Sequence, residues 1–270
     1  MHCDDALRLI QDSRHLLIEK PITADLTSAL KTQEVLAHYS KKSRVAYHLR
    51  FSETVIKLKE LIDSEKLGKL ISAGLNYSQD LSLWRPKVDE RQSVSARKEL
   101  GGGVLLEFSH EIEAVQYLVG RVRSISACSV STHGANTDGE VETLASFSGE
   151  TRNGKNFFIH LDMIANPPKR KWNFKFERGQ IDANILSGEI FISENGVDFY
   201  KFHNSAPFER DRAETLMLRS FLDQPSFNKI DLCTIDEATD VMKVIDAVKE
   251  SEEFKTLNNS KTTPRRKDKK

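Results

Sequence analysis

The sequence predicts an α/β segment followed by an α+β domain built on a large, mostly antiparallel open sheet flanked by helices. Two observations support this fold class. The first third of the chain alternates short apolar runs with helical patterns, which is typical of a parallel α/β layer. Beyond residue 70, strand-like runs separated by turn residues predominate. The 270 residues are enough for one large domain or two modest ones.

In the front part, apolar runs and helical spacing indicate strands and helices in alternation. Strands are predicted at 15–18 and 44–49, and helices at 6–10, 26–40 and 52–68. Thr23 or Asp25 can cap the helix that follows the first strand. Gly68 provides a C-terminal stop for the last of these helices.

The later part is dominated by predicted strands. They are ISAGLNYSQD, SISACSVST, EVETLASFSG, KNFFIHLDMIA and the alternating stretch over 171–202. The tripeptide ENG at 194–196 predicts a hairpin turn. A loop and helix are expected over 100–120, and two more helices around 211–223 and 235–249. The polar, basic end of the chain, 256–270, predicts a disordered tail.

Composition excludes several classes of function. Lys and Arg number 40 and Asp and Glu number 40, so no net charge draws the chain to nucleic acid or membranes. We expect the basic tail to be solubilising, with nucleic-acid binding as the minor alternative. Cys3, Cys128 and Cys233 fit no motif, which argues against a disulfide framework or a metal site. No apolar window is long enough to span a membrane and no signal peptide is evident, so a cytoplasmic protein is expected.

The stretch Glu19-Lys20-Pro21 follows the first predicted strand directly. Polar residues at the carboxyl end of a parallel strand face the crevice where α/β sheets bind ligands. Lys20 could therefore point into a site, as a donor or as a charge beside a reacting hydroxyl. The alternative is that the strand simply ends in a polar, proline-containing turn.

A second candidate is the stretch GGGVLLEFSHEIE. Its three glycines, 101–103, allow positive φ and close backbone approach before a helix. If the stretch is one helix, Glu107, His110 and Glu111 share a face. A histidine in a cleft is the usual proton carrier near neutral pH. The alternative is a flexible loop before an ordinary helix. The other histidines are expected to be structural or to lie at the surface.

The pair Trp84-Arg85 is a third candidate. Trp and Arg side chains can stack on a flat ring or hold an anion. The alternative is a tryptophan at the edge of the core beside a solvated arginine.

Five motifs in order resemble the Gfo/Idh/MocA family of oxidoreductases, which includes glucose–fructose oxidoreductase and inositol dehydrogenase. They are EKP at 19–21, YHLRF at 47–51, LGK at 67–69, WRP at 84–86 and SARKELGGGVLLEFSHEIE at 95–113. The resemblance covers nearly the whole chain, up to about Val248. It is strongest toward members that act on sugars in bacterial surface-polysaccharide pathways.

The resemblance implies hydride transfer between NAD or NADP and a sugar or polyol hydroxyl carbon, in carbohydrate or surface-polysaccharide metabolism. It implies a Rossmann domain followed by a sheet domain that carries the substrate platform and a homo-oligomer interface. Lys20, His110 and Glu107 are the implied catalytic residues, with His110 as acid and base. The implied cofactor contacts are Glu19, Lys20, Pro21, Trp84 and Arg85. The implied substrate contacts are Arg50, Arg91 and His110.

Two local departures bear on these residues. The commoner family pattern is Asp-x-Gly-x-His, whereas Glu107-Phe108-Ser109-His110 is one residue shorter. Glu90 and Val94 stand in a run where close relatives are expected to carry tyrosines. Substrate contacts there are therefore expected to be altered or lost.

A larger departure concerns the front of the Rossmann domain. No G-x-G-x-x-G phosphate-binding turn occurs in the sequence. We therefore expect that Met1 is an internal or wrongly chosen start, or that the gene is a decayed remnant. The expected division is a Rossmann remnant at 1–50, a substrate and oligomerisation domain at 51–255, and the tail. Such a chain is expected to be inactive or very weak alone. The alternative function is a non-catalytic sugar-binding or dimerisation module.

Overall fold

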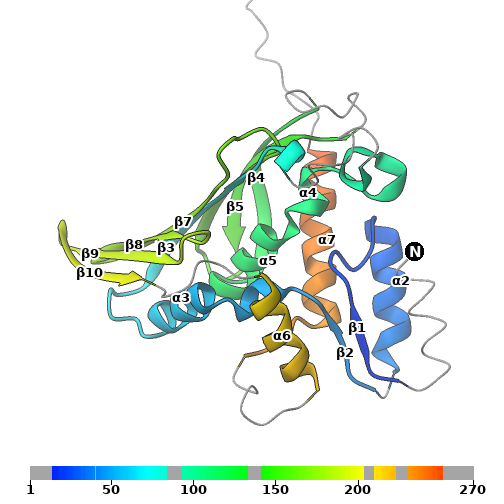
Figure 1. The fold of residues 1–270 in the computed structure, drawn as a ribbon, viewed down its shortest axis with the longest axis horizontal. Helices are drawn as coiled ribbons and strands as arrows, with labels where there is room; N and C mark the ends of the chain where they lie inside the picture. The colour runs from blue at the N-terminus through cyan, green and yellow to red at the C-terminus, as the bar shows by residue number, and fades with distance from the viewer. Residues whose placement is uncertain are drawn as a thin grey trace, which may run out of the picture.

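The structure is a computed structural model that describes residues 14–39, 41–83, 93–132, 141–203, 210–222 and 230–251. Its front part holds β1 (Leu16–Ile18), α2 (Leu26–Ala37) and β2 (Ser43–Val45). The two strands pair in parallel, with Leu16 opposite Ser43. Figure 1 shows this small sheet beside α2, at one end of the molecule. The predicted parallel α/β layer is confirmed.

Asp25 is the residue that caps α2. Its carboxylate accepts a hydrogen bond from the Ser28 backbone N–H at 2.8 Å, which satisfies one of the free donors at the helix start. Thr23, the other candidate, instead donates to the Asp25 carbonyl. It thereby helps to fix the turn that enters the helix.

The second predicted strand was too long. Only Ser43–Val45 is a strand, and residues His48–Phe51 form the 3-10 helix η1. The backbone N–H of Tyr47 turns back to the Val45 carbonyl at 2.9 Å, which ends the extended run. The sequence pattern that predicted a strand here therefore belongs to a turn. The side chains of this turn are all buried. This turn brings His48 and Arg50 inward.

The helix α3 (Glu53–Asp63) begins where the sequence predicts and ends earlier. The Ser52 side chain accepts from the Val55 N–H at 3.2 Å as its cap. Glu65 and Gly68 both have positive φ, so a turn separates the helix from the next strand. Gly68 thus ends this turn, and the helix stops at Asp63.

The large sheet has eight strands in the order β10-β9-β8-β7-β3-β6-β5-β4. Within it, β3 and β6 pair in parallel and the other neighbouring strands pair antiparallel, which confirms the predicted sheet type. The ENG turn joins β9 to β10, with Asn195 and Gly196 at positive φ. The strands are β3 (Leu70–Ser78), β4 (Val122–Ser131), β5 (Leu144–Thr151), β6 (Asn156–Asp162), β7 (Lys169–Phe176), β8 (Gly179–Asn184), β9 (Glu189–Glu194) and β10 (Val197–His203).

Helices cover one face of this sheet. They are α4 (Val104–Glu107), α5 (Ser109–Leu118) and α7 (Ile235–Glu250), whereas α6 (Arg210–Phe221) packs on η1. The short 3-10 turns are η2 (Leu81–Leu83), η4 (Val94–Ala96) and η5 (Lys98–Leu100). The central helix is α7, which contacts β4 and α5 on one side and β2 and α2 on the other. In Figure 1 it runs between the large sheet and the small one. A capping box of Thr234 and Glu237 starts it.

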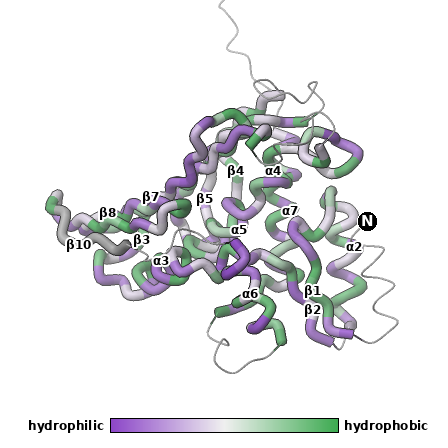
Figure 2. The backbone as a smooth tube through the Cα atoms, in the orientation of Figure 1, coloured by the Kyte–Doolittle hydropathy of each residue, from purple (hydrophilic) through white to green (hydrophobic). Residues whose placement is uncertain are grey.

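The two faces of the sheet differ in chemistry. Phe147, Ile159, Leu75 and Trp172 are paired across four strands and are all buried under the helices. The row one residue along, Ser146, His160, Asn76 and Lys171, is polar and lies on the open face. Figure 2 shows this change of hydropathy along the strands. Alternation of this kind is what a sheet with one covered face requires.

One hydrophobic core joins the small sheet, α7 and the covered face of the large sheet. The predicted boundary near residue 50 stays a prediction. The predicted helix at 6–10 and the predicted tail at 256–270 lie outside the described residues. None of the described helices is long and apolar enough to cross a membrane.

Candidate functional site

Lys20 lies just beyond the carboxyl end of β1, as predicted. Its Nζ donates to the carbonyl oxygen of Glu107 at 2.8 Å, which connects the small sheet to α4. The Lys20–Pro21 peptide is cis. Burial lowers the pKa of the Lys20 ammonium, while the Glu107 and Glu19 carboxylates act in the opposite direction. Lys20 is therefore held at a fixed position in a half-buried setting.

The predicted single helix over the glycine stretch is wrong. Helix α4 ends at Glu107 and α5 begins at Ser109, with Phe108 outside helical geometry between them. The Phe108 ring packs against the Tyr77 ring, with centroids 4.2 Å apart. This break separates Glu107 from His110, which one helix would have placed on a common face. The Glu107 carboxylate instead accepts from the Ser95 hydroxyl at 2.6 Å.

The glycines allow the backbone to approach closely, as predicted. A Cβ on Gly102 would lie 2.6 Å from the carbonyl oxygens of both Val94 and Ser95. Gly103 has φ of +111°, and its N–H donates to the Ser95 carbonyl at 3.0 Å. The glycine turn thus packs closely against the segment that carries Ser95. The Ser95 hydroxyl in turn holds the Glu107 carboxylate in position through its hydrogen bond.

His110 is 6% exposed, and neither ring nitrogen has a hydrogen-bond partner among the described residues. Its ring meets the His48 ring at 4.5 Å and the Tyr47 ring at 5.4 Å between centroids, in both cases edge to face. Burial lowers the pKa of His110 well below its usual value, and His48 and the cations Lys20, Arg170 and Arg210 lower it further. The imidazole is therefore neutral at neutral pH and able to accept a proton.

His48 was not singled out by the sequence analysis, which expected histidines other than His110 to be structural or at the surface. It is 8% exposed, and its Nδ1 lies 4.0 Å from Oε1 of Glu214. Burial, with help from Arg210, Arg170 and Lys20, lowers its pKa to about 3. The motif YHLRF contained this residue, but its position beside His110 depends on the unpredicted turn η1.

Arg170 and Glu111 form a buried ion pair at the back of the site. Two hydrogen bonds join them, Nε to Oε1 at 2.6 Å and Nη2 to Oε2 at 3.1 Å. The Arg170 guanidinium also lies over the Tyr77 ring, 4.3 Å from its centroid. The pair ties β7 to α5 and so fixes the helix that carries His110. The sequence predicts Glu111 on one helical face with His110. In the structure its carboxylate instead accepts both hydrogen bonds from Arg170.

Arg50, a predicted substrate contact, is 1% exposed and lies in a second buried ion pair. Its Nε and Nη2 approach Oε1 of Glu113 at 2.6 and 2.5 Å, and its Nη1 donates to the Asp231 carbonyl at 3.0 Å. It also stacks over the Tyr117 ring at 4.3 Å. These contacts tie η1 to α5. The assignment of Arg50 to substrate stays a prediction.

Arg210, at the start of α6, is another residue that the sequence analysis missed. Its Nε donates to Oε1 of Glu214 at 2.6 Å, and its positive charge lowers the pKa values of His48 and His110. Helix α6 packs on η1, so its first turn lies near the His48 side of the site. No motif near residue 210 signalled this role.

Several predicted contacts stay untested. Trp84, Arg85 and Arg91 lie outside the described residues. Glu19 is exposed and Pro21 is half-buried. In the described part of the chain no group of three His, Cys, Asp or Glu side chains is arranged to hold a metal ion.

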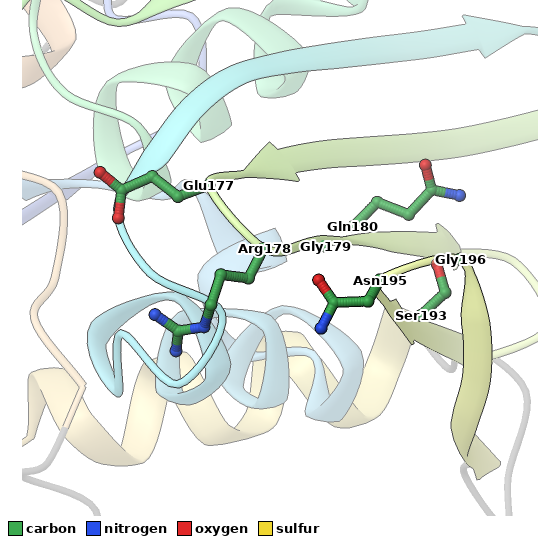
Figure 3. Close-up of a pocket in the computed structure, with 7 residues that line it drawn as sticks. All are labelled: Glu177, Arg178, Gly179, Gln180, Ser193, Asn195 and Gly196. Carbon is green, nitrogen blue, oxygen red and sulfur yellow. The ribbon is translucent and has the colours of Figure 1, made fainter.

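Two surface hollows lie elsewhere. One of about 520 Å³ is lined by the turn residues 177–180 and by Ser193, Asn195 and Gly196. Figure 3 shows Arg178 and Asn195 extending to the same side of this turn. The other, of about 400 Å³, includes Arg44, Arg121 and the Thr234 cap of α7. Neither includes Lys20 or His110.

Comparisons with known proteins agree with this architecture. Residues 55–182 match the family described as GFO/IDH/MocA C-terminal domain. Oxidoreductase P35 of Formosa agariphila is 26% identical over 249 residues, which cover 91% of this chain and 74% of that protein. Glucose-6-phosphate 3-dehydrogenase of Bacillus subtilis is 27% identical over 117 residues, which cover 43% of this chain and 33% of that protein.

Solved structures show the same fold. Levoglucosan dehydrogenase in complex with NADH superposes with a TM-score of 0.82 at 16% identity, covering 93% of this chain and 74% of that one. An inositol dehydrogenase homolog complexed with NAD+ from Azotobacter vinelandii gives 0.76 at 12% identity, covering 92% and 74%.

Proposed function

The chain belongs to the Gfo/Idh/MocA family, and on this premise we propose that it serves NAD(P)-dependent hydride transfer at a hydroxyl carbon of a sugar or polyol. The observation that carries the proposal is the state of His110. Its imidazole is buried, neutral and free of hydrogen bonds to the described residues, in the field of Lys20. Buried polar atoms almost always have a hydrogen-bond partner. Two buried ring nitrogens without such a partner are what we expect of a side chain that forms its hydrogen bond with a substrate hydroxyl. The names of related proteins support the substrate class, since they include dehydrogenases of glucose-6-phosphate and D-xylose.

The residues that follow β1 fit the nicotinamide end of the cofactor. Glu19, Lys20 and Pro21 lie at the carboxyl end of a parallel strand, the edge at which α/β sheets bind nucleotides. Related structures that carry NADH or NAD+ support this choice of cofactor. Trp84 and Arg85 complete the proposed cofactor contacts. When bound, the nicotinamide supplies or accepts the hydride, and the side chains of this chain supply the rest.

The proposed division of labour follows from charge and burial. Lys20 holds a positive charge beside the reacting hydroxyl, which favours an alkoxide-like transition state. His110 takes the hydroxyl proton during oxidation and returns it during reduction. Glu107 acts through position: its carbonyl holds the Lys20 ammonium, and its carboxylate is fixed by Ser95. Arg91 and Arg50 are the proposed substrate contacts. Arg50 can also act indirectly, because its ion pair with Glu113 positions α5, the helix that carries His110.

We assign oligomer formation to the polar open face of the large sheet as part of the same proposal. That face carries the row Ser146, His160, Asn76 and Lys171, together with half-exposed Phe158 and Phe191. Sedimentation velocity checks this part: a monomer at every concentration would contradict it.

Turnover and binding together test the proposed function. The purified chain is supplied with NAD+ or NADP+ and a panel of aldoses, sugar phosphates and inositols, and NAD(P)H formation is followed. In parallel, NMR of the ¹⁵N-labelled histidines records whether nucleotide and sugar shift the His110 signals. We expect saturable His110 shifts with at least one sugar, and NAD(P)H formation that is very weak, because the chain lacks a G-x-G-x-x-G turn, and that His110→Asn abolishes. Neither shifts nor NAD(P)H formation across the panel would contradict the proposal. A matched control is His160→Asn, a histidine on the open face of the sheet.

A further inference from the structure

His110 is too deeply buried to exchange a proton with water directly. The residue is 6% exposed, and the positive charges that act on it belong to Lys20, Arg170 and Arg210. This positive field disfavours an imidazolium at His110. A proton accepted there must therefore be passed on before the next turnover.

His48 packs directly against His110. The two rings meet edge to face, with centroids 4.5 Å apart and planes at 71°. Nδ1 of His48 also lies 4.0 Å from Oε1 of Glu214. Side-chain exposure rises from 11% at His48 to 36% at Glu214, so the three residues lead from the buried centre to the surface.

The carboxylates of the site other than Glu214 and Glu19 accept hydrogen bonds from other side chains. Glu107 accepts from Ser95, Glu111 is held at both oxygens by Arg170, and Glu113 is held by Arg50. Glu19 is exposed and acts on Lys20. Glu214 differs because its Oε1 accepts the Arg210 hydrogen bond at 2.6 Å and also makes the His48 contact. Arg210 thereby keeps Glu214 pointed at His48.

We propose that His48 and Glu214 form a proton route between His110 and solvent. The inference rests on the proposed function, because the route carries the proton that the hydroxyl loses. During oxidation the C–H bond yields a hydride to the nicotinamide, the O–H proton passes to His110, and a carbonyl forms. The proton then moves from His110 through the imidazole of His48 to the Glu214 carboxylate and to water. During reduction it travels the same way inward. Rotation of the His48 ring brings its nitrogens toward His110 and toward Glu214 in turn.

Charge explains why His48 suits a relay. Among the described residues, the titratable and charged groups that act on it include His110, Lys20, Arg170, Arg210 and Glu214. Burial, with help from the cations, keeps its ring neutral, so one nitrogen donates while the other accepts. A neutral ring can pass a proton without storing it, and the acid at the outer end provides the acceptor.

Kinetics of four proteins test the route: the wild type, His48→Ala, Glu214→Gln and the control Glu53→Gln. Glu53 is a matched control because its side chain is 33% exposed and forms an ion pair with Arg212 of α6, just as Glu214 is 36% exposed and pairs with Arg210 of the same helix. In dilute buffer we expect His48→Ala and Glu214→Gln to lower kcat by about tenfold or more with KM for sugar little changed, as for loss of a proton-transfer group. Added imidazole should restore His48→Ala, and Glu53→Gln should match the wild type. Wild-type kcat in Glu214→Gln, an exposed change that leaves the core intact, would overturn the route.

NMR provides a test that needs no turnover. In the wild type, His48 Nδ1 should carry the proton that points to Glu214, and Glu214→Gln should shift the ring toward the other tautomer while Glu53→Gln leaves it unchanged. An unchanged His48 tautomer in Glu214→Gln would also overturn the route. If no protein of the set reduces NAD(P)+, the proposed function fails, and the tautomer result still decides whether Glu214 and His48 are coupled.

Discussion

Arg170 and Glu111 are joined by two parallel hydrogen bonds, at 2.6 and 3.1 Å, while 6% and 0% of their side chains are exposed. A buried pair of this kind is strongly destabilising to break, because removal of one partner leaves an uncompensated charge. Replacing both partners by apolar residues costs much less. The pair therefore matters for the placement of α5 more than for net stability.

We predict that Arg170→Met lowers the free energy of unfolding by about 3–5 kcal/mol. Glu111→Leu alone should have a similar cost, since it leaves the Arg170 guanidinium unpaired. The double variant should recover much of the loss. Urea unfolding of all four proteins measures the coupling. Additive losses in the double variant would show that the two side chains act independently.

Gly102→Ala is predicted to disturb the site through the glycine turn. The new Cβ would lie 2.6 Å from two backbone carbonyl oxygens, and backbone atoms cannot yield as a flexible side chain can. We expect a loss of about 2–4 kcal/mol, in the upper range for single substitutions. Gly196→Ala is the control, because its Cβ meets nothing within 4 Å and only the positive φ of +81° opposes it. That control should cost about 1–2 kcal/mol. Equal thermal shifts in the two variants would contradict the packing argument.

Much of the fold could be predicted from the sequence, because burial leaves a periodic signal. The row of Phe147, Ile159, Leu75 and Trp172 lies on one face, and the polar residues beside each of them alternate with it. Caps such as Asp25 and the Asn195-Gly196 turn carry local chemistry that needs no tertiary contact. The type of both sheets and most element positions followed from such signals.

The site was less predictable, because its geometry depends on two breaks in regular structure. Turn η1 replaced the end of a predicted strand, and Phe108 interrupted a predicted helix. These breaks are set by tertiary contacts, Arg50 with Glu113 and Phe108 with Tyr77. Lys20 and His110 could be chosen from a motif resemblance, whereas His48 and Arg210 reach the site only through long-range packing.

Stability is predicted to fall as the pH falls below about 6.5. His48 has a pKa lowered to about 3 in the folded protein, so it stays neutral while an unfolded histidine, with a pKa near 6.5, takes up a proton. The unfolded state then binds more protons, so stability is full above pH 6.5 and is lost as the pH falls toward 3. His110 acts in the same direction.

Between pH 7.5 and pH 5, we expect His48 to contribute a loss of roughly 2 kcal/mol. Urea unfolding at the two pH values measures this, and His48→Gln should make the pH dependence shallower. The matched control is His160→Gln on the open face of the sheet. A His48→Gln protein with the full pH dependence of the wild type would show that His48 titrates normally in the folded state.

Lys20→Met is predicted to separate function from stability. Burial disfavours the Lys20 ammonium, as its lowered pKa shows, so an apolar side chain of similar length removes an unfavourable charge. The change also removes the hydrogen bond to the Glu107 carbonyl, worth about 1 kcal/mol. These effects oppose each other, and the melting temperature should move by no more than a few degrees, whereas hydride transfer should be lost. Calorimetry and the NAD(P)H assay measure the two outcomes. A Lys20→Met protein with a melting temperature far below the wild type would show that Lys20 holds the fold together, and unchanged turnover would remove it from the site.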